Sequence, residues 1–351
     1  MIKKYMLKIT AALTVIMIVV LEFCGCVNNS TDYTAKEYFA MDTFITVKAK
    51  GVNNNDLDEV YSLIKDMESV FSRTIETSEI SRLNLSETPF RVSEECAEVL
   101  KKLNLISLDT HGAFNPCVGA LTDLWDVNGE KYVPTKEEIS GVLPLVEYGS
   151  YEVANDGTVT KENTKTLFDL GAAVKGYAAE QSISKLKSMG VSDAMISIGG
   201  NIAVCGSAPG SDNEWTVGIK NPFYPDSVAG YVKCTDTVVS VSGDYERYFE
   251  KDGVIYHHIF DSSTGYPADS SLKSVAVFAR DGLVSDALST ALFVMGTEKA
   301  LEFYSEGKYD FEAVLFDKSG AVYLTDGLKD SFVLFEDAKY NENNRLYVSE
   351  H

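Results

Sequence analysis

Two stretches of the chain carry residue types that can do chemistry together. His257 and His258 end an apolar run and are followed by the carboxylate of Asp261. Further on, Asp286 and Thr290 stand four residues apart, which places both on one face of a helix. Mg²⁺ takes a few oxygen ligands from a protein and leaves its other positions to water and phosphate. The stretches therefore predict half of a magnesium site beside a proton acceptor, which points to phosphoryl chemistry.

Each of these signals also has a common structural explanation. Neighbouring residues of a strand face opposite ways, so at most one of His257 and His258 faces a shared site. Asp286 and Thr290 can equally be a helix carboxylate and a threonine that bonds back to its own helix. The pair of stretches is a hypothesis that needs support from elsewhere in the chain.

The formal net charge of −21 limits the ligands that the chain can accept. Nucleic acid is excluded as a partner, because a phosphate polymer would meet net repulsion. Two like charges about 4 Å apart repel by roughly 4 kcal/mol at an effective dielectric constant of about 20. A phosphate-bearing small ligand therefore needs a metal ion, local Lys or Arg, or the N-terminus of a helix.

Two further segments offer groups for such a ligand. Residues 169–177 read D-L-G-A-A-V-K-G-Y at a predicted strand-to-helix junction, where glycine permits close approach and Lys175 adds positive charge. The order is not that of a phosphate-binding Walker loop, because the lysine precedes the second glycine. From Phe114 to Trp125, aromatic and amide groups can sandwich a flat ring. A tight turn and ordinary core packing are the respective alternatives.

The N-terminus resembles an export signal. Three lysines within the first eight residues precede an apolar run over residues 9–21, which is short for a membrane span. The Cys-Gly-Cys sequence that follows resembles a bacterial lipobox, and Gly25 makes Cys26 the expected lipidated residue. We therefore expect a lipoprotein signal peptide over 1–25, a polar tether over 26–36, and attachment to the outer face of the cell membrane. An uncleaved anchor helix is the alternative.

Four cysteines remain after such processing: Cys96, Cys117, Cys205 and Cys234. Their spacing lacks C-x-x-C pairs, which argues against zinc. An exported protein can form disulfides, and buried free thiols are equally consistent with the sequence.

The elements that must position these residues interleave helices with antiparallel strands, without regular β-α-β alternation. We expect one compact α+β body over 37–340 and a loose polar tail over 341–351. The expected helices cover residues 56–71, 93–110 (with Ser93 as N-cap), 135–143, 172–189, 284–295 and 298–305. The expected strands cover 38–50, 167–170, 195–205, 215–220, 228–233, 238–241, 254–260 and 273–280, with turns at 155–157 and 317–320 that each join two strands.

Taken in order, the motifs resemble those of the ApbE-type FAD:protein FMN transferases, from about Met41 to Gly296. The matching segments are Met41-Asp42-Thr43 (family M-G-T), Ser78 to Asn84 (S-E-[IL]-S-R-[LF]-N), Gly112 to Trp125 (G-x-F-D-x-T-V-G-P-L…L-W), Asp169 to Tyr177 (D-x-G-A-x-x-K-G-Y), Gly199-Gly200-Asn201 (G-G-N), the histidine loop 257–267 (H-x-I-D-P-x-T-G-x-P) and Asp286 to Thr290 (D-A-L-S-T).

The resemblance implies a T-fold-like α+β body that cleaves the pyrophosphate of FAD with Mg²⁺. FMN would pass to a Ser or Thr hydroxyl of an exported acceptor protein, and AMP would leave. Carried over by position, Mg²⁺ would be held by the Ala172 carbonyl and the side chains of Asp286 and Thr290, and His258 would be the base. The positions that would line the FAD pocket are Met41, Ala113, Phe114, Asn115, Asp169 and Lys175.

The chain departs from the family pattern at four places. Asp42 replaces glycine, Arg73-Thr74 stands where an aromatic residue often covers the ligand, Asn115 replaces aspartate, and Ser262-Ser263 replaces Pro-Arg. None touches the expected metal residues or His258, so we expect the transferase activity to survive. An FAD pyrophosphatase and a non-catalytic flavin-binding lipoprotein are the alternatives.

Overall fold

The computed structural model describes residues 32–211, 214–224, 226–335 and 346–349. The expected signal peptide and Cys26 lie outside these residues, as does most of the expected tether. Among the described helices, none combines the length and the hydropathy that a membrane crossing requires.

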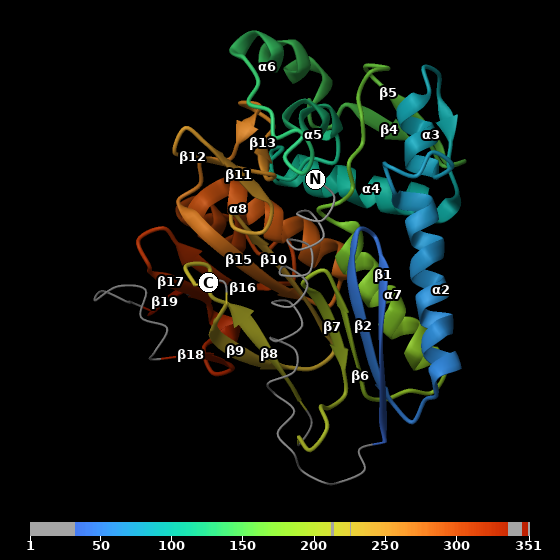
Figure 1. The fold of residues 1–351 in the computed structure, drawn as a ribbon, viewed down its shortest axis with the longest axis vertical. Coiled ribbons are helices and arrows are strands. Elements are labelled where there is room, and N and C mark those ends of the chain that lie inside the picture. The colour runs from blue at the N-terminus through green and yellow to red at the C-terminus, as the bar shows by residue number, and fades with distance from the viewer. Residues whose placement is uncertain (1–31, 212–213, 225, 336–345, 350–351) are drawn as a thin grey trace, which may run out of the picture.

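A nine-stranded sheet forms the centre of the molecule, in the order β1-β2-β6-β7-β10-β15-β16-β17-β19 (Figure 1). Neighbouring strands are antiparallel, except that β17 and β19 are parallel. The strands are β1 Tyr33–Ala40, β2 Thr43–Lys50, β6 Ala194–Ile198, β7 Asn201–Cys205, β10 Thr237–Gly243, β15 Leu272–Ala279, β16 Glu312–Asp317, β17 Val322–Thr325 and β19 Leu346–Ser349.

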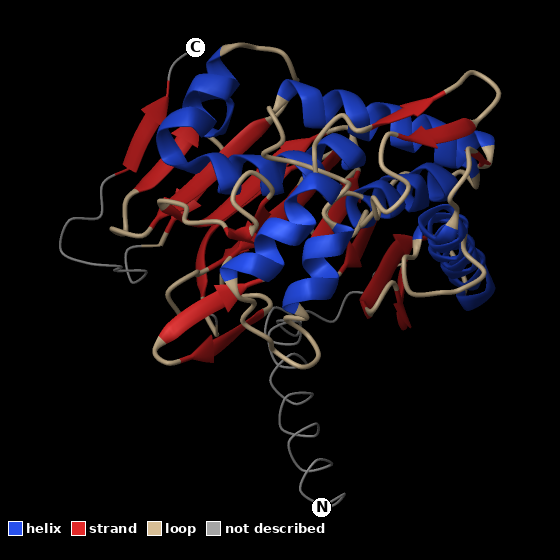
Figure 2. Cartoon of the chain, turned by 90° about the horizontal axis from the view of Figure 1, so that it is seen from above, coloured by secondary structure: helices blue, strands red, loops and turns tan. Residues whose placement is uncertain are grey.

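The sheet is covered on both faces, as the alternation along β15 shows. Val275 and Val277 belong to a core shared with the helices α2 (Asn54–Phe71), α7 (Val174–Ser188) and α8 (Gly282–Ser305). Ala276 and Phe278 belong to a second core, under a small sheet of β18, β9 and β8. Its strands are β8 Trp215–Lys220, β9 Val228–Cys234 and β18 Phe332–Leu334. Figure 2 shows the helices layered against the strands.

Shorter elements form a third core beyond one end of the sheet. Trp125 is fully buried there, and its indole N–H donates to the Gly265 carbonyl at 2.9 Å, which ties the histidine loop to this layer. The elements around this third core are α5 Gly119–Trp125, α6 Lys136–Val142, η1 Leu143–Leu145, β11 Tyr248–Lys251, β12 Val254–His257, β13 Phe260–Asp261 and β14 Tyr266–Pro267. The buried residues of α3 Glu79–Leu85, α4 Glu94–Asp109, β4 Tyr151–Val153 and β5 Thr158–Lys161 belong to the main core, and β3 Phe90–Arg91 pairs with β5. The 3-10 turn η2, Asp326–Leu328, follows β17.

Local chemistry explains where several expected elements begin. Ser93 caps α4 by accepting from the Cys96 N–H, as expected, and Thr135 forms a capping box with Glu138 at the start of α6. The expected turn at 155–157 joins β4 and β5 as an antiparallel hairpin. The mixed α+β body and these elements confirm the fold class read from the sequence.

Several expectations about strands were wrong. The predicted strand 195–205 is a hairpin of β6 and β7 that turns at Gly199-Gly200, and the predicted strand 254–260 ends at His257, before β13 begins at Phe260. The predicted strand 38–50 is a hairpin of β1 and β2, and β1 begins at Tyr33, inside the expected tether. Residues 167–170 do not form a strand but make one isolated bridge, between Val118 and Leu167. The reason is that a side chain, described below, hydrogen-bonds to the backbone of this segment. The tail was expected to be loose, yet β19 pairs with β17 at the sheet edge.

The two helices predicted over 284–295 and 298–305 are confirmed. Both lie within α8, and the backbone between them breaks at Gly296, whose φ of 77° lies outside the helical region. Helices α3 and α5 and strands β3, β11, β14 and β18 were not predicted. All four cysteines among the described residues are free thiols; three are buried and Cys234 is half-buried.

Candidate active site

The site begins where helices α7 and α8 cross. A Cβ atom on Gly176 would lie 2.2 Å from the Gly282 carbonyl oxygen and 2.8 Å from the Asp286 Cβ, so only glycine permits this approach. The Gly176 N–H donates to Asp286 Oδ2 at 3.0 Å. We call these three residues the helix crossing. It places the Asp286 carboxylate against the first turn of α7.

Asp286 is 4% exposed, and burial raises the pKa of its carboxyl above the usual value. The charge of Lys175, the backbone N–H groups of Lys175 and Gly176, and the side chain of Asn201 act in the opposite direction. Asn201 opens β7 directly after the Gly199-Gly200 turn, so the G-G-N motif delivers an amide to the carboxylate. The Asn201 Oδ1 atom has no hydrogen-bond partner among the described residues.

The donor set fits a hard cation. The Gly176 N–H is one of the first N–H groups of α7, which have no partner within the helix, and it donates to Asp286. No described backbone N–H bonds to the Ala172 carbonyl just before this helix. Thr290 lies one turn beyond Asp286 on α8. A carboxylate, a free carbonyl and a hydroxyl are the oxygen ligands that Mg²⁺ prefers, and so few leave room for water and phosphate.

Two serines beside Thr290 were missed by the sequence analysis. Ser242 Oγ on β10 lies 3.1 Å from Thr290 Oγ1 and 2.8 Å from Ser289 Oγ. Ser289 Oγ donates to the Asp286 carbonyl at 2.8 Å. Ser289 stood inside the D-A-L-S-T motif, whereas nothing near Ser242 in the sequence indicated a contact with α8.

His258 has its ring fixed by the backbone. Nδ1 lies 3.1 Å from the Arg247 carbonyl oxygen, which can only accept, so Nδ1 carries the hydrogen and Nε2 keeps a free lone pair. Burial, and then the charge of Arg247, lower the pKa of His258 to about 4, which keeps the ring neutral. The charge of Lys175 lowers the pKa of both His258 and Asp286, so the two lie in one electrostatic neighbourhood.

His257 is the last residue of β12, and its ring makes different contacts from that of His258. Its Nδ1 accepts from the Ile259 N–H at 3.3 Å, so Nε2 carries the hydrogen and donates to the Ala268 carbonyl at 3.2 Å. The ring is buried edge-on against Phe293. Both ring nitrogens are occupied, which makes His257 structural and leaves His258 as the only available base of the pair.

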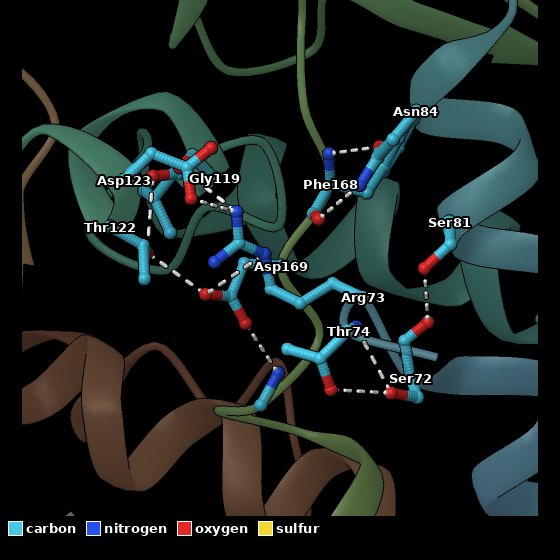
Figure 3. A network of polar contacts seen from close by, with 12 residues as sticks. Ser72, Arg73, Thr74, Ser81, Asn84, Gly119, Thr122, Asp123, Phe168 and Asp169 are labelled. Atoms are coloured by element: carbon cyan, nitrogen blue, oxygen red, sulfur yellow. Dashed lines mark hydrogen bonds and ion pairs between the residues drawn. The ribbon is translucent and has the colours of Figure 1, made fainter. Parts of the chain in front are cut away.

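Asp169 is held by a network that Figure 3 shows from close by. Its Oδ1 accepts from the Gly171 N–H at 3.0 Å, and its Oδ2 accepts from the Thr122 hydroxyl at 2.9 Å. Arg73 Nε lies 3.8 Å from Oδ2, and Arg73 Nη2 donates to Asp123 at 2.7 Å. Arg73 thus places a guanidinium, engaged with two carboxylates, where the resemblance expects an aromatic ring.

The backbone before Asp169 is held from α3. The Asn84 amide donates to the Phe168 carbonyl at 2.9 Å and accepts from the Phe168 N–H at 2.7 Å (Figure 3). This side chain therefore takes the place of a neighbouring strand, which is why the predicted strand 167–170 is absent. We call residues 168–171 the Asp169 loop. Lys175 Nζ donates to the Gly171 carbonyl at the end of this loop.

Met41 lies at the turn of the β1–β2 hairpin, and its N–H donates to Glu68 at 2.6 Å. Met41 and Asp42 have φ values of 52° and 56°. Glycine adopts this conformation without strain, which explains the usual Gly at position 42, and aspartate tolerates it better than most residues. A Cβ on Gly199 would lie 2.6 Å from Thr43 Oγ1, so the turn that carries Met41 contacts the G-G-N turn.

The other expected pocket residues are used differently. Phe114 is 1% exposed within the main core, so its ring packs against the protein. The Asn115 amide donates to the Val146 carbonyl at 2.7 Å, and its oxygen accepts from the Cys117 N–H at 2.9 Å. Ala113 is half-buried beside them. The contacts with a flat ring that we expected of Phe114 and Asn115 stay a prediction, because both side chains are engaged with the protein itself.

Comparison with known proteins places the chain in a family. The family model described as "ApbE family" matches residues 41–315. The chain is 33% identical over 267 residues to the FAD:protein FMN transferase of Treponema pallidum (strain Nichols), covering 71% of this chain and 74% of the relative. It is 32% identical over 273 residues to that of Klebsiella pneumoniae (strain 342), covering 76% and 83%. The crystal structure of the ApbE protein from Thermotoga maritima superposes with a TM-score of 0.78 at 31% identity, covering 85% of this chain and 98% of that one. With matches of this extent and a shared fold, the chain belongs to the ApbE family.

Proposed function

We propose that this chain transfers FMN from FAD to a Ser or Thr hydroxyl of an exported acceptor protein, with Mg²⁺ required and AMP released. The observation that carries the proposal is the buried Asp286 carboxylate, with the free Ala172 carbonyl in reach of the same helix start and neutral His258 in the same neighbourhood. The names of the relatives support the transfer from FAD to protein.

The residues of the site have two roles: some neutralise the charge of the diphosphate, and one accepts a proton. Asp286, Thr290 and the Ala172 carbonyl would hold Mg²⁺, which when bound neutralises the diphosphate and polarises its phosphorus. Without a cation, the diphosphate would enter beside a buried carboxylate in a protein of net charge −21. Lys175 adds one positive charge beside Asp286.

The covalent step exchanges one P–O bond for another. The acceptor hydroxyl oxygen bonds to the phosphorus of the FMN half as the bond from that phosphorus to the bridging oxygen breaks, and the bridging oxygen leaves with AMP. The hydroxyl proton passes to His258 Nε2, which the Arg247 contact leaves unprotonated. A base with a pKa of about 4 is weak, so it takes the proton only once the forming bond has made the hydroxyl acidic.

We also propose that Cys26 is lipidated and holds the protein at the outer face of the cell membrane. The body begins near this anchor with β1, an eight-residue strand that is about 26 Å long. Its far end carries Met41 and the turn beside the candidate site.

The test uses the full-length protein in detergent, supplied with FAD, Mg²⁺ and an exported flavoprotein as acceptor. We expect a fluorescent band that persists on a denaturing gel, an acceptor heavier by one FMN less water, and AMP in equal amount. AMP and FMN formed at the same rate without acceptor would identify a pyrophosphatase. FAD bound without any AMP would identify a carrier. His258→Ala should abolish the band, and His257→Gln serves as the neighbouring control.

A further inference from the structure

The hydroxyls of Thr290, Ser242 and Ser289 form a continuous chain that ends at the backbone carbonyl of Asp286. Each hydroxyl has a single hydrogen, which it can donate once. The chain joins α8 to β10, so its members come from two elements that the sequence keeps more than 40 residues apart. Its direction can be worked out by following that one hydrogen per residue.

The direction is fixed at the carbonyl end. The Asp286 carbonyl can only accept, so Ser289 spends its hydrogen there, at 2.8 Å. Ser289 is then an acceptor in its 2.8 Å contact with Ser242, which must donate. Ser242 has no hydrogen left for the 3.1 Å contact with Thr290, so Thr290 donates to Ser242. In each of these three hydrogen bonds, the donor is therefore the hydroxyl on the side of Thr290.

We propose that Ser242 and Ser289 are positioning residues that prepare Thr290 as a metal ligand. With its hydrogen turned to Ser242, the Thr290 oxygen presents its lone pairs on the remaining side. A helical threonine commonly donates back to the carbonyl four residues earlier, which here is that of Asp286. In this structure the Thr290 hydroxyl instead lies within hydrogen-bond distance of Ser242, and Ser289 sets the direction by donating to the Asp286 carbonyl. This inference rests on the Mg²⁺ site of the proposed function.

The two serines contribute unequally. In Ser242→Ala the Thr290 hydrogen loses its acceptor, and rotation of the hydroxyl competes with metal binding. Partners that orient metal ligands typically account for about 10- to 100-fold in affinity. In Ser289→Ala, Ser242 still accepts from Thr290, so the loss should be smaller. Ser242→Thr keeps the hydroxyl and should restore most of the affinity.

The experiment measures binding of Mn²⁺ alone, by electron paramagnetic resonance on the full-length protein without FAD. The matched control is Ser240→Ala, which removes a buried hydroxyl two residues earlier on the same strand that has no partner among the described residues. We expect about a tenfold or greater weakening for Ser242→Ala, a smaller one for Ser289→Ala, and none for Ser240→Ala.

The outcomes separate this inference from the proposed function. If Asp286→Ala weakens Mn²⁺ binding while Ser242→Ala binds as the wild type does, the metal site stands and the positioning role is overturned. If Asp286→Ala and the wild type bind equally, both are overturned. Equal weakening by Ser240→Ala would assign the effect to strand packing and also overturn the positioning role.

Discussion

The helix crossing and the Asp169 loop meet at the candidate site, but they are held by different forces. At the crossing, backbone approaches backbone, and Asp286 is 4% exposed. The loop is held by side chains, and the ion pair of Arg73 with Asp123 leaves those side chains 19% and 58% exposed. In a closely packed region a single added methyl group changes stability, whereas exposed ion pairs contribute little to stability. None of the four departures, at Asp42, Arg73-Thr74, Asn115 and Ser262-Ser263, lies at the crossing, so we expect them to leave the position of Asp286 unchanged.

The largest expected effect is that of Gly176→Ala. The added methyl would lie 2.2 Å from the Gly282 carbonyl oxygen, which is backbone and cannot rotate away. Overpacking of this kind costs about 3 kcal/mol or more in unfolding free energy, and it should separate Asp286 from the start of α7. Urea unfolding and Mn²⁺ binding would measure the two effects.

Gly141→Ala is the matched control for that change. Gly141 lies in helix α6, and nothing approaches its added Cβ within 4 Å. Alanine at an open helical site is expected to stabilise by about 0.5–1 kcal/mol. If both variants unfolded at the same urea concentration, the crossing would not be the tightly packed region that we describe.

Asp286→Asn should remove function while preserving the fold. The carboxyl has a raised pKa because it is buried, so its ionised form disfavours folding at neutral pH in the absence of metal. The neutral amide should therefore leave the metal-free protein equally stable or more stable. Flavin transfer should fall by about 10²- to 10³-fold or more with the loss of the cation ligand. Thermal melting with and without Mg²⁺ would show whether the ion still stabilises the variant.

The pH dependence tests whether His258 is held neutral. Its pKa is about 4 when folded and near the ordinary 6.5 when unfolded. Between these values the unfolded chain binds more protons, so this imidazole's contribution to stability is present above pH 6.5 and is lost as the pH falls toward about 4. Comparing the urea unfolding of the wild type and of His258→Gln across this pH range isolates the contribution of the imidazole to the free energy of unfolding. An acid limb of the rate profile near 6.5 instead of 4 would contradict the assignment.

The sequence predicted what short-range chemistry decides and missed what tertiary partners decide. The cap at Ser93 and the turn at 155–157 depend on neighbouring residues and were read correctly. The strand predicted over 167–170 failed because the Asn84 amide, far away in the chain, takes the ladder bonds of Phe168.

The residues of the candidate site show the same difference between local patterns and tertiary contacts. Asp286 and Thr290 share a helix face, and their spacing revealed it. Ser242 contacts Thr290 only because β10 packs under α8, and no local pattern encodes that contact. The structural role of His257 likewise required its partners, Ile259 and Ala268, to be placed.

The smallest expected effect is that of Arg73→Ala in the Asp169 loop. Thr122 and the Gly171 N–H still hold Asp169 in this variant, and an ion pair with one exposed partner, such as that of Arg73 with Asp123, contributes about 0.2–1 kcal/mol. Unfolding should change within that range, and the KM for FAD should rise by about two- to fivefold with kcat nearly unchanged. Arg73→Lys keeps the positive charge but lacks the planar guanidinium. We expect it to restore the stability of the wild type more fully than the KM for FAD. A loss of activity in Arg73→Ala as large as that in Gly176→Ala would mean that this loop, with its chain-specific arginine, is as constrained as the helix crossing.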